Sequence, residues 1–213
     1  DFEGLFPAII TPMSRDTGKL NEAAFREVME FNIQAGVHGF WVAGGTGESI
    51  FLDDEENMRI AEIAADQSKG RIKNIMHVGA PTTERAVALA ANAARASVEA
   101  ICCVPPFFYR QSDEAIVEHY RAVGEAANLP LFVYNLPQST GVEITPELML
   151  KIQDGVPQLK GLKHSAPTFP NVRAFANMGL DCFIGSKCST DFPLSESSTI
   201  IHSSGSKFCF TTD

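Results

Sequence analysis

This sequence of 213 residues lacks the features that would commit a chain to a membrane, a nucleotide or a metal. Its longest unbroken apolar run, residues 86–91, is far shorter than the roughly 18 residues that cross a bilayer. It has no P-loop, no G-x-S-x-G and no G-x-G-x-x-G motif, and its His, Cys, Asp and Glu residues show no metal-binding spacing. We therefore predict no membrane association, no cofactor and no catalytic metal.

Positive charge is scarce as well. The chain has 17 Lys and Arg residues against 26 Asp and Glu residues, which gives a formal net charge of −9. Such a balance argues against nucleic acid and anionic membranes as partners. It does not exclude a small anionic substrate, because a site can be locally positive on an acidic protein.

Cysteine is sparse and shows no disulfide or metal pattern. There are five cysteines, an odd number, and no C-x-x-C motif. Cys102 and Cys103 are adjacent within an apolar run, which is typical of buried strand thiols. This usage predicts a reducing compartment, and we expect the cytoplasm.

Short β-rich runs alternate with longer helical patterns up to about residue 186. Strands are expected over residues 5–11, 39–43, 72–78, 99–104, 131–134, 159–164 and 182–185. Helices are expected over residues 21–35, 53–67, 82–96, 112–127 and 170–178, and another begins at Thr145-Pro146. Asp53 or Asp54 is a suitable cap for the second helix.

This alternation predicts an α/β fold with a parallel sheet. The strands are nearly continuous apolar runs, such as residues 100–104, which indicates burial on both faces of the sheet. Seven strands without a dinucleotide-binding glycine motif favour a (β/α)8 TIM barrel over a doubly wound sheet.

The end of the chain departs from the alternation. Residues 187–213 are rich in Ser and Thr and show no helical period, so the barrel domain is assigned to residues 1–186. A complete barrel needs an eighth strand and helix, and neither is recognisable here. Truncation, splicing or a shifted reading frame explains this better than a working seven-stranded barrel, because an open barrel exposes two sheet edges.

Lys163 is the first candidate for chemistry. It lies at the end of a predicted strand, and polar residues at the carboxyl ends of parallel barrel strands form the active site. Burial in a barrel mouth would lower the pKa of its amine and leave a nucleophile that forms an imine with a ketone. The alternative is a surface lysine in an ion pair. Lys160 lies three residues earlier and should face the other way.

Tyr134 and the glycine loop that ends the second strand are further candidates. The Tyr134 phenol could carry a proton, or it could be a half-buried core tyrosine. The loop Gly44-Gly45-Thr46-Gly47 could offer backbone N–H groups and the Thr46 hydroxyl to a carboxylate, or be a plain turn.

Two histidines are expected to stay outside the chemistry. His77 lies inside the third predicted strand and is interpreted as a packed side chain. His164 directly follows Lys163, so its side chain should point to the opposite face of the strand.

Several segments together resemble the dihydrodipicolinate synthase and N-acetylneuraminate lyase family. The resemblance extends from Phe2 to about Gly185 and is carried by residues 4–12, 44–48, 134–137, 140–141 and 161–163. Any one of these segments is weak evidence, but all of them at barrel-compatible spacing are specific. They favour the catalytic interpretations of Lys163 and Tyr134.

The resemblance implies a class I aldolase. Lys163 would form a Schiff base with pyruvate or another 2-keto acid, and Tyr134 would relay protons and orient the substrate. Gly45 and Thr46 would hold the substrate carboxylate. The chemistry of the family needs no cofactor or metal, and its members are commonly homotetramers of full barrels, so a homo-oligomer is expected if this barrel is complete.

Departures from the family pattern bear on the substrate. Synthases carry Thr-Thr in the glycine loop, where this chain has Gly45 first, and an arginine where this chain has Ser139. Both changes favour a lyase that acts on a 2-keto-3-deoxy sugar acid or a sialic-acid-like substrate. The alternatives are dihydrodipicolinate synthase activity and a truncated, non-catalytic barrel remnant. Phe108 replaces a common second tyrosine, for which Tyr109 is a speculative substitute.

Overall fold

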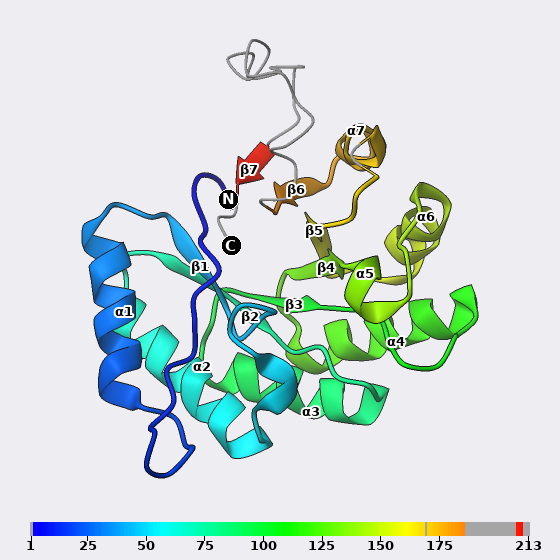
Figure 1. Ribbon diagram of the computed structural model, residues 1–213. Coiled ribbons are helices and arrows are strands. Elements are labelled where there is room, and N and C mark those ends of the chain that lie inside the picture. The colour runs from blue at the N-terminus through cyan, green and yellow to red at the C-terminus, as the bar shows by residue number, and fades with distance from the viewer. Residues whose placement is uncertain (1, 169, 186–207, 211–213) are drawn as a thin grey trace.

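The computed structural model describes residues 2–168, 170–185 and 208–210, which form an α/β fold of alternating strands and helices (Figure 1). The strands are β1 (Gly39–Val42), β2 (Lys73–His77), β3 (Ala100–Cys103), β4 (Leu131–Asn135), β5 (Leu159–His164), β6 (Asp181–Ile184) and β7 (Phe208–Phe210). The helices are α1 (Glu22–Gln34), α2 (Asp54–Ser68), α3 (Thr83–Arg95), α4 (Asp113–Ala127), α5 (Pro137–Thr140), α6 (Pro146–Gly155) and α7 (Pro170–Asn177), with a 3-10 helix, η1 (Ser49–Phe51).

The strands form one parallel sheet in which neighbours in space are also neighbours in sequence, from β1 to β7. The sheet curls, and its helices cover the outside of the curve (Figure 1). All strands therefore end at the same rim of the sheet, which brings the residues after each strand together. None of the described helices is long and apolar enough to cross a membrane.

Six of the seven predicted strands are confirmed, but the strand predicted over residues 5–11 is not. This segment lies beside β1 and makes only an isolated parallel bridge, between Ala8 and Trp41. The N–H of Ile9 donates to the Trp41 carbonyl at 3.2 Å, and the Trp41 N–H donates to the Pro7 carbonyl at 3.0 Å. Pro7 has no N–H of its own, so it cannot extend the ladder as a regular strand residue does.

The C-terminal stretch contains one element that the sequence did not reveal. Residues 208–210 form β7, which pairs in parallel with β6, with Phe183 opposite Cys209. The rest of the stretch assigned to an atypical tail, residues 187–207 and 211–213, lies outside the described residues. Within the described residues, β1 and β7 are the outermost strands of the sheet.

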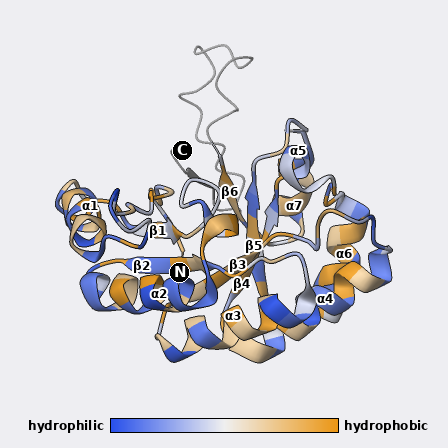
Figure 2. Ribbon diagram, turned by 60° about the horizontal axis from the view of Figure 1, so that its bottom comes forward, coloured by the Kyte–Doolittle hydropathy of each residue, from blue (hydrophilic) through white to orange (hydrophobic). Residues whose placement is uncertain are grey.

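The helices begin where the sequence provides caps. Asp53 accepts from the Glu56 N–H at 2.8 Å, and the Glu56 carboxylate accepts from the Asp53 N–H at 3.2 Å, which together form a capping box. Thr145 caps α6 ahead of Pro146, as predicted. Most helices show hydrophilic residues on one side and hydrophobic residues on the other in Figure 2, where strands such as β6 are hydrophobic.

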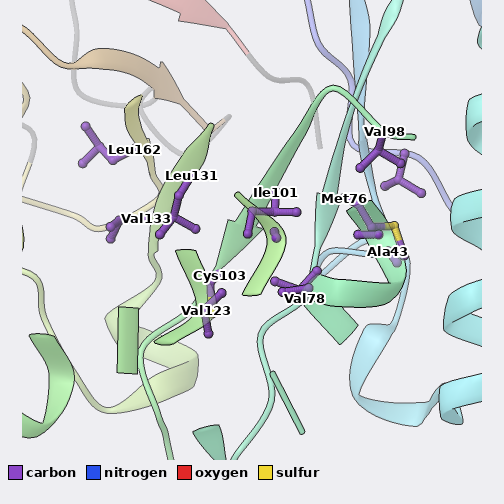
Figure 3. Packing of buried hydrophobic residues seen from close by; sticks show 14 of the residues in the cluster. Ala43, Met76, Val78, Val98, Ile101, Cys103, Val123, Leu131, Val133 and Leu162 are labelled. Carbon is purple, nitrogen blue, oxygen red and sulfur yellow. The ribbon is translucent and has the colours of Figure 1, made fainter. Parts of the chain in front are cut away.

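The two faces of the sheet carry separate hydrophobic clusters. On the outer face, strand residues such as Met76, Ile101 and Val133 pack with residues of the surrounding helices, such as Val123 (Figure 3). We call the opposite, concave side the inner face. It is built from Trp41, Ile75, Cys102, Phe132 and Phe183, with contributions from the N-terminal segment, such as Phe6. Edge-to-face aromatic contacts, with ring centroids 5.0–5.8 Å apart, join Trp41, Phe132 and Phe183 on this face.

Candidate active site

Lys163 is buried on the inner face, near the end of β5. Its side chain is only 2% exposed, although lysine is almost never fully buried without a compensating environment. In the sheet it lies between Tyr134 of β4 and Phe183 of β6. Its Nζ atom is 4.9 Å from the centre of the Tyr134 ring and 5.2 Å from the centre of the Trp41 ring. The amine is thus shielded from water and lies within cation–π distance of two aromatic rings.

The neighbours of Lys163 on β5 confirm the predicted alternation of faces. Lys160 is half exposed, and its Nζ atom is 3.2 Å from the Asp181 carboxylate. His164 is buried on the outer face, where its Nδ1 atom lies 3.3 Å from the side-chain nitrogen of Asn135 and its ring lies against Phe175 of α7. Lys163 is therefore the lysine of this strand that faces the inner side.

Tyr134 connects Lys163 with the glycine loop after β1. Tyr134 is 6% exposed, and a Cβ atom placed on Gly45 would lie 3.7 Å from its hydroxyl oxygen. Gly45 itself is exposed and Thr46 is partly exposed, so the loop is open to solvent on one side. The structure thus brings together Lys163, Tyr134 and Gly45, with Thr46 next along the loop.

The glycine loop is held in a tight turn. The N–H groups of Glu48 and Ser49 donate to the carbonyls of Gly45 and Gly44, at 3.1 and 3.2 Å. The Thr11 hydroxyl donates to the Gly47 carbonyl at 2.8 Å. A Cβ atom on Gly47 would lie 2.8 Å from the Ala43 Cα atom, too close for any larger residue. Because these bonds use loop carbonyls as acceptors, the turn is fixed without consuming the N–H groups of Gly45 and Thr46.

Two more titratable side chains from neighbouring strands face this site. His77 ends β2 and is 6% exposed, with its ring edge-on to Tyr134 at 6.0 Å between centroids. Burial, reinforced by the positive charge of Lys163, lowers the pKa of His77 to about 4. Burial raises the pKa of the Cys102 thiol, against the opposing effect of Lys163. His77 is packed, as predicted, but its position beside the candidate site was not foreseen.

The aromatic residues after β3 do not join the site within the described chain. Phe108 and Tyr109 are 84% and 73% exposed, and their rings contact each other at 4.9 Å. Tyr109 therefore does not supply a second phenol beside Lys163 here. Among the described residues, no group of three or more His, Cys, Asp or Glu side chains is arranged to hold a metal ion.

A curled parallel sheet, covered by helices and carrying a polar site near its strand ends, defines the class of barrel-type α/β proteins. The chain belongs to the dihydrodipicolinate synthetase family, whose model matches residues 1–186. This agrees with the resemblance found in the sequence segments around Gly45, Tyr134 and Lys163.

Relatives within the family carry two different activities in their names. The chain is 35% identical over 162 residues to the 4-hydroxy-tetrahydrodipicolinate synthase of Phenylobacterium zucineum, across 76% of this chain and 54% of the relative. It is 39% identical over 146 residues to the N-acetylneuraminate lyase of Escherichia coli K12, across 68% of this chain and 49% of the relative. The chain thus spans about half the length of the curated relatives that it matches.

Solved structures give the same picture. CdNal from Clostridium difficile, in complex with mannosamine, is 27% identical with a TM-score of 0.87, over 99% of this chain and 70% of that one. The dihydrodipicolinate synthase of Aquifex aeolicus is also 27% identical, with a TM-score of 0.86 over 99% of this chain and 70% of that one. The described fold is therefore shared by both kinds of protein.

Proposed function

We propose that this protein is a class I aldolase or lyase in which Lys163 forms a Schiff base with pyruvate or another 2-keto acid. The observation that carries the proposal is the burial of Lys163, 2% exposed, with its amine 4.9 Å from the Tyr134 ring. An amine withdrawn from water is neutral more often, and only the neutral amine attacks a carbonyl.

The reaction follows from these groups. The Lys163 amine adds to C2 of the keto acid, and the carbinolamine loses water to leave a protonated imine. The imine takes up the electron pair of the C3–C4 bond, which breaks as the C4 hydroxyl loses its proton and becomes an aldehyde. The resulting enamine takes a proton at C3, and water then hydrolyses the imine, which releases pyruvate and frees the amine. We assign to the Tyr134 phenol the transfer of protons to the departing water and from the C4 hydroxyl.

The glycine loop is the proposed carboxylate site. Gly45 lies beside the Tyr134 hydroxyl, and the backbone hydrogen bonds that fix the turn among the described residues do not use the N–H groups of Gly45 and Thr46. Backbone N–H groups in such a turn attract anions, and the Thr46 hydroxyl adds a further donor. This would hold the keto acid with its C2 carbon towards Lys163.

We assign the substrate to the lyase branch, a 2-keto-3-deoxy sugar acid or a sialic-acid-like compound. Gly45 and Ser139 support this choice, because both lack groups that the synthases of the family carry. Dihydrodipicolinate synthase activity is the second candidate, favoured by the match to the Phenylobacterium zucineum enzyme. Release of pyruvate from each sugar acid, compared with condensation of pyruvate with aspartate semialdehyde, discriminates between the two.

The proposal extends to the whole protein as a complete (β/α)8 barrel, a homo-oligomer of the cytoplasm that uses no metal or cofactor. Support for closure comes from β7, which adds a strand beyond β6, and from the N-terminal segment beside β1. The buried free thiols of Cys102 and Cys103 suit a reducing compartment. The competing possibility is a non-catalytic barrel remnant, motivated by the Ser- and Thr-rich residues 187–213, where the sequence shows no recognisable closing strand and helix.

Borohydride trapping tests the proposed function. The purified protein is incubated with pyruvate, sodium borohydride is added, and the intact mass is measured. A mass increase equal to one reduced pyruvate adduct is expected, and none should appear when pyruvate is omitted. A folded sample that gains no mass would remove the Schiff-base mechanism and leave the remnant hypothesis.

A further inference from the structure

His77 is a buried side chain whose two ring nitrogens form no hydrogen bond with the described residues. The side chain is 6% exposed, and neither ring nitrogen has a hydrogen-bond partner within the part of the chain that the structure describes. The Ala43 backbone favours the charged ring, but it does not reach hydrogen-bonding geometry. Buried polar groups without partners are rare and cost about 1–3 kcal/mol each, so their presence calls for a physical reason.

The imidazole faces the Lys163 site. His77 has the same parity on β2 as Ile75, which belongs to the inner-face cluster, and it pairs with Cys102 of β3. Its ring stands at 86° to the Tyr134 ring, with centroids 6.0 Å apart. One more polar atom on this face, the Trp41 Nε1 atom, is also buried without a partner among the described residues.

The backbone beyond β2 makes room for the ring. A Cβ atom on Gly79 would lie 2.7 Å from the His77 Nε2 atom, closer than real side chains approach. The Val104 Cγ2 atom would lie 2.6 Å from the same Cβ position, so glycine at position 79 lets the backbone pass close to both Val104 and the His77 ring.

The imidazole is neutral near pH 7, because burial and the charge of Lys163 lower its pKa to about 4. A neutral imidazole offers one N–H donor and one acceptor nitrogen. It can therefore bond an oxygen atom of a ligand without adding a second positive charge beside Lys163.

We propose that His77 is a further substrate-binding residue of the Lys163 site, whose imidazole forms a hydrogen bond with an oxygen atom of the bound 2-keto acid. This inference rests on the proposed function, since it assumes that a keto acid occupies the site. The bond satisfies a buried ring nitrogen that has no partner among the residues that the structure describes.

Two variants of His77 test the inference through pyruvate trapping. His77→Phe keeps a ring against Tyr134 but removes both nitrogens, and the pyruvate concentration for half-maximal trapping should rise about tenfold, the loss of one hydrogen bond. His77→Gln restores a donor and an acceptor and should recover most of this affinity. The trapping rate at saturating pyruvate should change little in either variant. An unchanged half-maximal concentration in His77→Phe would overturn the inference while the Schiff-base function stands.

Imidazole NMR signals of the unaltered protein provide a measurement that depends neither on variant folding nor on trapping. Adding pyruvate should shift the His77 ring resonances and leave unchanged those of His119, a buried residue of α4 whose ring is bonded to Thr83 and Cys103. A shift at His77 without any borohydride adduct would support the binding role and reject the Schiff base. If pyruvate shifts the resonances of neither histidine ring, the inference is wrong, whatever the trapping result.

Discussion

The two faces of the sheet are made by the same strands, but particular buried polar side chains on them differ in their hydrogen bonding. On the outer face, the Asn135 amide donates to the Ile144 carbonyl at 3.1 Å, and the His119 ring lies 2.9 Å from the Thr83 hydroxyl. On the inner face, Lys163 and His77 lie against aromatic rings. These outer groups are bonded by the protein and hold its framework, whereas the ring nitrogens of His77 on the inner face have no hydrogen-bond partner among the described residues.

The largest expected effect separates Lys163 from Lys160 on β5. Lys163→Arg places a guanidinium in the site, which is not deprotonated in proteins and cannot form the imine, so pyruvate trapping should fall on the order of 10³-fold or more. Lys160→Arg changes a half-exposed side chain paired with Asp181 and should trap at the normal rate. Equal trapping by both variants would contradict the claim that the inner-face lysine, and not Lys160, forms the imine.

The next effect concerns the Tyr134 phenol. Tyr134→Phe keeps the ring that contacts Lys163 and His77 but removes the proposed proton carrier. The rate of imine formation should fall by about 10²- to 10⁴-fold, the usual contribution of a positioned acid or base. Adding borohydride at successive times after mixing with pyruvate, and measuring the fraction of protein trapped, gives this rate. An unchanged rate would mean that the hydroxyl carries no proton in this step.

Acid should weaken the fold through histidines on both faces. Burial lowers the pKa of His77 and His119 to about 4, below the ordinary value of 6.5. The unfolded chain therefore binds more protons between these values, so stability is full above about pH 6.5 and falls as the pH drops towards 4, by up to about 3 kcal/mol per histidine.

Urea unfolding at about pH 7 and about pH 4.5 checks this pH dependence. His119→Gln, on the outer face, should reduce the difference between the two pH values and leave pyruvate trapping unchanged. A pH-independent unfolding midpoint in the unaltered protein would contradict the burial argument for both rings.

The smallest effect is expected at Gly45. A Cβ atom at this position would lie 3.7 Å from the Tyr134 hydroxyl, an ordinary van der Waals contact, so Gly45→Ser should fit. The new hydroxyl would stand beside the phenol and raise the trapping rate by less than about tenfold. Gly47→Ser, by contrast, places its Cβ atom 2.8 Å from the Ala43 Cα atom and should distort the loop. Similar trapping rates for Gly45→Ser and Gly47→Ser would contradict the loop geometry described above.

Strand periodicity was enough to predict six strands and the placement of Lys163 and Tyr134. Alternation along β5 put Lys163 and His164 on opposite faces, and residues near the ends of parallel strands necessarily meet at one rim. The N-terminal strand was predicted from its apolar residues, but Pro7 cannot take part in a regular ladder. β7 has three residues in a Ser- and Thr-rich stretch, too short for a periodic signal.

The position of His77 beside the site could not be recognised from the sequence. An inward histidine on a strand can be bonded by a neighbouring element or left open to a ligand, and the pattern is the same in both cases. Only the three-dimensional contacts show that the His77 ring nitrogens have no hydrogen-bond partner among the described residues, whereas the ring of the helical residue His119 is bonded. Gly79 follows His77 by two residues, and the reason for a glycine there becomes clear only when the structure shows how close the His77 ring lies.

The most direct measurement is the location of the reduced pyruvate adduct by peptide mass spectrometry after borohydride trapping. The adduct should lie on Lys163 alone, with Lys160 in the same peptide region unmodified. An adduct spread over exposed lysines, or carried by Lys160, would contradict the claim that the inner face of the sheet provides the reactive amine.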